Sequence, residues 1–298
     1  MAALDKDMLA HMKDADGFIA ALDQSGGSTP KALMAYGIED GAWKDESDMF
    51  DMVHAMRARI VTCPKFTGER VIAAILFEMT MDREFEGQPA PAYLWKEKKV
   101  VPLLKCDKGL APEENGCQVM KPIPGLEDTL ARAKGLGVFG TKMRSRVAEA
   151  NEVGIKAVVA QQFEVAKTII KCGLCPIIEP EVDINTPNKA GAEKMLLDAI
   201  MEELSKLAAD QLVMLKLTIP TEDNLYTPAI QHPNVVRVVA LSGGYPRDDA
   251  NARLKKNKDM IASFSRALME GITAKMTDDE FADSLDKAIQ SIYEASKN

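Results

Sequence analysis

Eight short apolar runs alternate along the chain with longer segments of helical periodicity. Most of these runs are apolar at nearly every position, which is typical of parallel strands covered on both faces. Each run ends close to a polar residue. The predicted strands cover residues 18–23, 71–77, 100–107, 138–144, 175–182, 212–219, 235–242 and 260–265.

The segments between these runs predict helices. Two of them have apolar faces that repeat every three or four residues, one made of Ile155, Val159, Phe163, Ala166 and Ile170, the other of Leu196, Ile200, Leu204 and Leu207. Gly173 is the expected end of the first. The last helix opens with a capping box, Thr277-x-x-Glu280. We also expect extra helix in the long connection between the first two strands.

Eight strand and helix units in a chain of 298 residues favour an α/β fold of the (β/α)8 TIM barrel type over a doubly wound sheet. No linker or low-complexity run divides the chain, so a single domain over residues 1–298 is expected. Because the carboxyl ends of barrel strands converge, the polar residues that end the runs are candidates for a common site.

Composition narrows the possible partners. The chain has 37 Lys+Arg against 45 Asp+Glu, a net charge of −8, which disfavours binding to nucleic acid or to anionic membranes. The longest apolar stretch, residues 71–77, is far shorter than the roughly 18 residues of a membrane span. Five cysteines without a secretion signal predict free thiols and a cytoplasmic location.

Lysines stand where strands should be apolar. Lys216 lies within the apolar run 212–219, and burying an unpaired ammonium is costly, so such a lysine tends to become a neutral amine. A neutral amine can attack a carbonyl and form a Schiff base. Lys105 and Lys142 end two other strands and would help to hold an anionic substrate. The alternative is that each lysine reaches the barrel mouth and stays solvated.

Two carboxylates, Glu179 and Glu181, end the strand at 175–182 and face the same way by the strand period of two. A carboxylate beside an amine can move protons while a carbinolamine forms and loses water. The alternative role, which does not exclude the first, is to pair with the lysines.

Two loops could hold phosphate. Asp23 ends the first strand and precedes a turn rich in hydroxyls and glycine, residues 24–28, whose alternative is a plain strand-to-helix turn. The glycine loop at 241–244 follows the seventh strand, where barrels commonly bind phosphate, and Arg266 follows the eighth.

Three other patterns carry no function. The G-x-G-x-x-G match at 135–140 leads into a strand instead of following one, so it does not indicate a dinucleotide site. The Cys172-x-x-Cys175 pair precedes its strand and has no second pair, so it predicts a structural turn. His11, His54 and His232 are scattered, which disfavours a metal-dependent reaction.

The ordered motifs at the strand ends resemble those of the class I fructose-1,6-bisphosphate aldolases, Schiff-base lyases on a (β/α)8 barrel, and are closest to the short bacterial branch. The resemblance covers about residues 17–266, and its motifs lie at 20–28, 105–109, 140–144, 178–181, 215–217, 241–244 and 263–266. Longer members of the family have Tyr-Gly where this chain has Phe264-Ser265.

The resemblance implies a role for each matching residue. Lys216 would form the Schiff base, Glu179 would act as general acid and base, and Asp23 as base at the C4 hydroxyl. Lys142 would assist as a cation and Glu181 as the second carboxylate. The residues implied in binding the 6-phosphate are Ser25, Ser28, Lys31, Lys105 and Arg144, and those at the 1-phosphate are Ser242, Gly243, Ser263 and Arg266.

The resemblance also implies an activity, the reversible cleavage of fructose 1,6-bisphosphate to dihydroxyacetone phosphate and glyceraldehyde 3-phosphate in glycolysis and gluconeogenesis. It implies no cofactor and no metal, phosphorylated ketoses and triose phosphates as ligands, and a homo-oligomer. Two alternatives stay open: a Schiff-base aldolase for another phosphorylated sugar, such as tagatose bisphosphate, and a barrel that binds sugar phosphates without catalysis.

Overall fold

Eight parallel strands close into a barrel in the computed structural model, which describes residues 3–298. Around the barrel the order is β5-β2-β1-β11-β10-β9-β8-β7, and β7 pairs back onto β5. The strands are β1 (Phe18–Leu22), β2 (Val71–Leu76), β5 (Val101–Lys105), β7 (Gly140–Val147), β8 (Cys175–Val182), β9 (Val213–Thr218), β10 (Val235–Leu241) and β11 (Ile261–Phe264). The predicted strands and the TIM barrel are confirmed.

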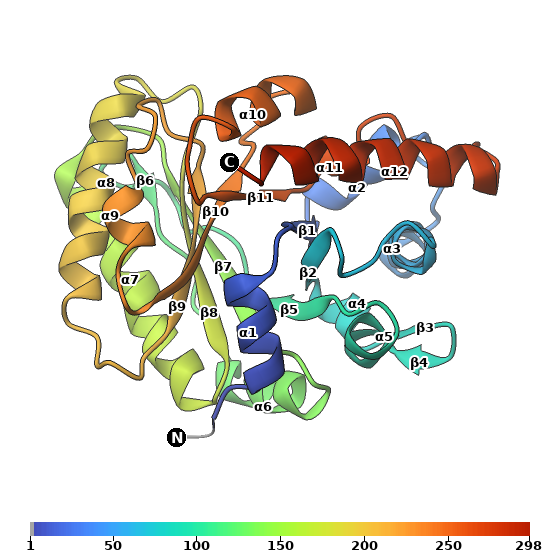
Figure 1. Ribbon diagram of the computed structural model, residues 1–298, viewed down its shortest axis with the longest axis horizontal. Helices are drawn as coiled ribbons and strands as arrows, with labels where there is room; N and C mark the ends of the chain where they lie inside the picture. Colours follow the sequence, from blue (N-terminus) through green and yellow to red (C-terminus); the bar gives the residue numbers. More distant parts are fainter. Residues whose placement is uncertain (1–2) are drawn as a thin grey trace.

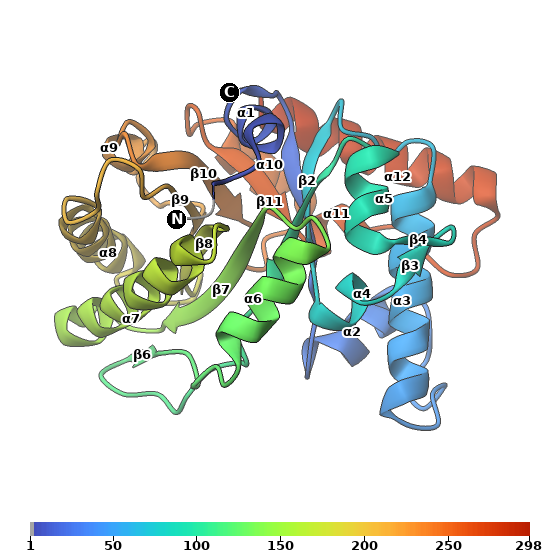
Figure 2. The same cartoon turned by 90° about the horizontal axis from the view of Figure 1, so that it is seen from below.

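Helices connect these strands around the outside (Figures 1 and 2). They are α1 (Lys6–Asp14), α2 (Ser28–Ala35), α3 (Glu46–Thr62), α4 (Glu78–Met81), α5 (Ala90–Lys96), α6 (Leu126–Gly135), α7 (Glu152–Lys171), α8 (Lys189–Leu204), α9 (Thr227–Ile230), α10 (Arg247–Leu254), α11 (Arg266–Met269) and α12 (Asp278–Ala295). In Figure 1, α7 and α8 lie together beside β7, β8 and β9. None of the helices within residues 3–298 is long and apolar enough to cross a membrane.

The helix predictions are confirmed with one exception. The capping box forms, because the Thr277 hydroxyl accepts from the Glu280 backbone N–H and the Glu280 carboxylate accepts from the Thr277 N–H. Helices α2 and α3 occupy the long first connection. Leu207 was wrongly placed on the face of α8, which ends at Leu204 with Ser205 as its cap, so Leu207 packs on the core from the following turn.

Three short strands complete the fold: β3 (Glu84–Phe85), β4 (Gln88–Pro89) and β6 (Cys117–Gln118). β3 and β4 form a small hairpin, and β6 pairs antiparallel with the end of β7. Beyond Arg144, where the sequence predicted its end, β7 pairs with β6 on one side and β8 on the other, and the strand continues to Val147.

The alternation of side chains along the barrel strands determines where the polar residues at the strand ends lie. Successive side chains of a strand point to opposite faces, so every second residue points inward. The inward residues of the amino-terminal half form one apolar cluster, which includes Ala21, Leu103, Ile177 and Met214. The inward positions two residues further along these four strands are Asp23, Lys105, Glu179 and Lys216. The strand period therefore gathers charged groups in one layer at the carboxyl ends.

Helix α1 covers the amino-terminal end of the barrel. Its Met8 and Met12 are buried in the same apolar cluster as the barrel interior. Arg237, on β10, donates to the carbonyl oxygens of Met12 and Ala15, each at 3.0 Å. Among residues 3–298, apolar packing and these two hydrogen bonds cover this end of the barrel, and the charged layer lies toward the other end.

Candidate active site

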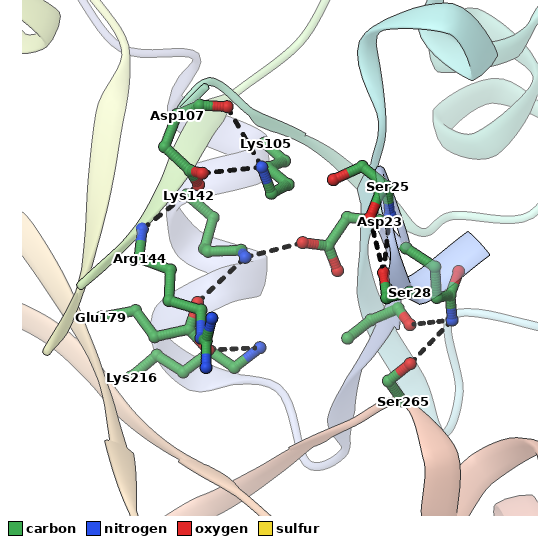
Figure 3. A network of polar contacts seen from close by, with 12 residues as sticks. Asp23, Ser25, Ser28, Lys105, Asp107, Lys142, Arg144, Glu179, Lys216 and Ser265 are labelled. Atoms are coloured by element: carbon green, nitrogen blue, oxygen red, sulfur yellow. Dashed lines mark hydrogen bonds and ion pairs between the residues drawn. The ribbon is translucent and has the colours of Figure 1, made fainter. Parts of the chain in front are cut away.

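Four buried charged residues form a continuous chain of ion pairs at the centre of the charged layer. Lys216 Nζ lies 3.1 Å from Glu179 Oε1, and Lys142 Nζ lies 2.9 Å from Glu179 Oε2 and 2.7 Å from Asp23 Oδ2. Figure 3 shows Lys142 between Asp23 and Glu179, with Lys216 beside Glu179. All four are at least nine-tenths buried. Positive and negative charges therefore alternate along this row of ion pairs, which crosses β9, β8, β7 and the end of β1.

The burial of Lys216 and Lys142 decides whether these two side chains are solvated. Lys216 and Lys142 are only 4% and 3% exposed, which excludes solvated side chains at the barrel mouth. Lys216 pairs with Glu179 on the neighbouring strand, which is the pairing of a lysine with a strand-end carboxylate that the sequence left open. The amine is thus buried beside a group that can exchange a proton with it.

Neighbouring opposite charges determine the ionisation of Asp23 and Lys142. Burial alone would raise the pKa of the Asp23 carboxyl, but the ammonium groups of Lys142 and Lys216 outweigh it and lower the pKa to about 2. Burial lowers the pKa of Lys142, but the carboxylates of Asp23, Glu179 and Asp107 raise it well above its ordinary value. Lys142 is therefore a permanent cation at neutral pH, and Asp23 a permanent anion.

The ionisation of Asp23 predicts a pH-dependent contribution to stability. A carboxyl whose pKa falls from 3.8 to about 2 on folding stabilises the protein by about 2 kcal/mol above pH about 4. This contribution is lost as the pH falls toward 2, because the native carboxyl then becomes protonated. We expect Asp23→Asn to reduce the unfolding free energy measured in urea by about 2 kcal/mol at pH 6 and by clearly less at pH 3. Equal losses at the two pH values would contradict this.

A second polar cluster lies beside the first and contains the other predicted cations. Lys105 Nζ is 2.7 Å from Asp107 Oδ1, and Arg144 Nε is 2.5 Å from Glu181 Oε2. Burial lowers the pKa of the Arg144 guanidinium, but the Glu181 carboxylate raises it above its ordinary value. The Lys105 side chain is 11% exposed and that of Arg144 is 35% exposed, so both cations reach the solvent-facing side of the layer.

The turn after β1 lies across the opening from these cations (Figure 3). The Ser28 hydroxyl accepts from the Ser25 backbone N–H at 2.9 Å and donates to the Ser25 carbonyl at 2.8 Å, which closes the turn. Lys31 lies exposed on α2, outside the buried clusters.

The carboxyl ends of β10 and β11, with the turns that follow them, contribute the remaining predicted site residues. Ser242 and Ser263 are 6% and 1% exposed, and the Ser263 hydroxyl has no hydrogen-bond partner among the described residues. Gly243 and Gly244 have positive φ angles of 63° and 119°, which favour glycine. A Cβ atom on Gly244 would lie 3.3 Å from Nη2 of Arg266, so the guanidinium packs directly on this glycine backbone.

Comparison with known proteins identifies the family. The family model for class-I fructose-bisphosphate aldolase matches residues 8–242. Fructose-bisphosphate aldolase class 1 from Synechocystis sp. is 57% identical over 292 residues, which covers 98% of this chain and 97% of the relative. The chain belongs to the class I fructose-bisphosphate aldolases.

Solved structures show the same fold as this aldolase. Fructose-bisphosphate aldolase from Plasmodium falciparum superposes with a TM-score of 0.78 at 19% identity, covering 99% of this chain and 96% of that one. A protein from Corynebacterium glutamicum superposes with a TM-score of 0.51 at 13% identity, covering 97% and 93%. At these identities the likeness concerns the barrel alone.

One residue that organises the aldolase site had no predicted role. Asp107 is 4% exposed, and its Oδ1 accepts from Lys105 Nζ and from the Gly109 backbone N–H at 3.1 Å. Its Oδ2 accepts from the Arg144 N–H at 3.2 Å. Asp107 therefore joins β5 to β7 through its bonds to Lys105 and to the Arg144 backbone. The available signal was its position two residues after Lys105, just past a strand end.

Proposed function

We propose that this aldolase acts through a Schiff base between Lys216 and C2 of fructose 1,6-bisphosphate. The observation that carries the proposal is the buried Lys216 amine, 3.1 Å from a carboxylate and at the carboxyl end of a closed barrel. The Lys216 amine, the Glu179 carboxylate that can carry its proton and the Lys142 cation then lie within one layer. Iminium formation requires groups of these kinds close together.

The Schiff base forms first. Lys216 passes a proton to Glu179, which lies beside it, and the neutral amine attacks the C2 carbonyl. Glu179 then returns this proton to the carbinolamine hydroxyl, which leaves as water. Lys142 holds the other Glu179 oxygen at 2.9 Å and so orients the carboxylate toward the reacting nitrogen. Glu181 fixes Arg144 in the same way on the neighbouring strand.

Cleavage follows from the iminium. It withdraws electrons from C3, so the C3–C4 bond breaks without a free carbanion, and Asp23, ionised at neutral pH, accepts the C4 hydroxyl proton. Glyceraldehyde 3-phosphate is released, and the enamine left on Lys216 is protonated and hydrolysed to dihydroxyacetone phosphate. Condensation runs the same steps backward.

The two phosphates would be held by two different groups of residues at the carboxyl ends of the strands. The 6-phosphate is assigned to Ser25 and Ser28 in the turn after β1, to Lys31 on the following helix α2, and to the facing cations Lys105 and Arg144. The 1-phosphate is assigned to Ser242, Gly243, Ser263 and Arg266. Support comes from the unpartnered Ser263 hydroxyl and from the Arg266 guanidinium packed on glycine backbone, because both leave donors free for an anion.

Reductive trapping tests this function. Borohydride added with dihydroxyacetone phosphate reduces the imine, and we expect a stable adduct on the peptide that contains Lys216, found by mass spectrometry. Borohydride without the ketone is the control and leaves the peptide unmodified. A label on another lysine, or no label while cleavage continues, would contradict the mechanism. Comparison of kcat/KM for the fructose and tagatose bisphosphates tests the sugar assignment.

A cytoplasmic location is proposed from the cysteines. All five are free, and four of them are buried. Free thiols are typical of a reducing compartment. Cell fractionation followed by immunodetection measures the location. The homo-oligomer implied by the family resemblance stays a prediction, which light scattering of the purified protein measures.

A further inference from the structure

Helix α3 contributes a fully buried arginine that the mechanism does not use. Arg57 has no solvent exposure and no carboxylate partner among the described residues. Its Nη1 donates to Thr80 Oγ1 at 2.8 Å, and its Nη2 donates to the Gln24 carbonyl at 2.5 Å and to Gln24 Oε1 at 3.2 Å. Burial lowers the pKa of Arg57 to about 10, which the Asp23 carboxylate opposes. The guanidinium is still charged at neutral pH, so its bonds to Gln24 are charge-assisted.

Gln24 connects Arg57 to both phosphate turns. Its backbone lies between Asp23 and Ser25, at the start of the turn assigned to the 6-phosphate. Its side-chain Nε2 donates to Ser265 Oγ at 2.7 Å, and Ser265 directly precedes Arg266 in the turn assigned to the 1-phosphate. Arg57, Gln24 and Ser265 therefore form one hydrogen-bonded line across segments 241 residues apart in the chain.

This hydrogen-bonded line includes Ser265, where this chain differs from the longer members of the family. Glycine at this position, as in the longer family members, has no side chain to accept from Gln24. In this chain the serine hydroxyl accepts that bond. The two turns are therefore joined by side chains.

We infer that Arg57 is a positioning residue that, through Gln24 and Ser265, sets the spacing of the two phosphate sites and so favours bisphosphates over monophosphates. A bisphosphate must engage both turns at once, so an error in their spacing weakens its binding. A monophosphate engages one turn and is insensitive to the spacing.

The position of the general base does not depend on this line. Asp23 pairs with Lys142 at 2.7 Å and directly follows β1, whereas Gln24 is the residue that Arg57 holds. Loosening Arg57 should therefore change KM for the bisphosphate more than kcat. A residue that only stabilised the fold would change neither, or would reduce the activity on all substrates equally.

The test compares fructose 1,6-bisphosphate with fructose 1-phosphate, and it rests on the proposed function. For Arg57→Lys we expect KM for the bisphosphate to rise about tenfold, with kcat for the bisphosphate and kcat/KM for fructose 1-phosphate changed by less than about threefold. Gln24→Ala should act in the same direction. The double variant should show less than the product of the two effects, because both changes break one line.

The control is Arg59→Lys, two residues further along α3, where the side chain reaches the protein surface and pairs with Asp278. It should leave both substrates unchanged. If Arg57→Lys does not fold, Thr80→Val and Gln24→Ala take its place in the test. Thr80→Val removes the bond between Arg57 and Thr80, and Gln24→Ala removes the bond between Gln24 and Ser265. Equal losses for both substrates, or an unchanged ratio in all variants, would overturn the inference. Failure of the wild-type enzyme to form the borohydride adduct would instead overturn the proposed function.

Discussion

Lys216→Met is expected to reduce kcat for fructose 1,6-bisphosphate by about four orders of magnitude or more, because methionine fills similar space but has no amine to form the imine. The fold should persist. Glu179 keeps its ion pair with Lys142 at 2.9 Å, so the substitution leaves no isolated charge in the core. A steady-state assay coupled to the triose products measures the loss, and thermal unfolding confirms that the variant is folded.

Two controls make this result specific. The variant should form no adduct with borohydride and dihydroxyacetone phosphate, while the wild type does. A chelator should leave wild-type activity unchanged, as expected of a class I enzyme. Residual turnover in Lys216→Met near the wild-type rate would place the Schiff base elsewhere.

Lys142→Met is expected to have the largest effect on stability. Lys142 is 3% exposed and pairs with both Asp23 and Glu179, so its removal leaves Asp23 without an ion-pair partner in a buried site. Breaking a buried pair in this way costs about 3–5 kcal/mol, measured as the unfolding free energy in urea at pH 7. We also expect kcat to fall by roughly 10²–10³-fold, since Asp23 and Glu179 lose the cation that orients them.

The pH dependence of the same variant is a second readout. Without Lys142 the pKa of Asp23 should rise from about 2 to above its ordinary value, because burial, which raises it, is then opposed only by more distant cations. The variant should therefore lose less stability than the wild type between pH 6 and pH 3. Adding Asp23→Asn to Lys142→Met should restore part of the stability, since it removes the uncompensated charge. A double variant less stable than Lys142→Met would contradict this explanation.

The barrel was predictable because its strands are covered on both faces, which makes them nearly continuous apolar runs. The charged layer was predictable for a related reason, since a lysine or glutamate stands out in such a run. What the sequence did not show was which charges pair. Lys216 and Glu179 meet through the order and register of neighbouring strands β9 and β8, so the sequence indicated pairing between lysines and carboxylates but not which lysine pairs with which carboxylate.

Arg57 and Asp107 show a second limit. In the sequence Arg57 is one charged position on a helix of mixed composition, and nothing near it signals complete burial. Its partners lie 23 and 33 residues away, and the next link lies 241 residues further along the chain. Contacts of this kind depend on barrel closure and on side-chain reach, neither of which leaves a local pattern.

Within the described residues α1 covers the amino-terminal end of the barrel, so we expect ligands to pass at the carboxyl ends of the strands. The ketose must enter, and both trioses must leave, past the carboxyl ends of the strands. In the proposed mechanism the ketone half is still bonded to Lys216 after cleavage, so only the aldehyde half is free to depart. The order of exit is thereby imposed, glyceraldehyde 3-phosphate first and dihydroxyacetone phosphate last. The reverse reaction must accordingly load the ketone before the aldehyde.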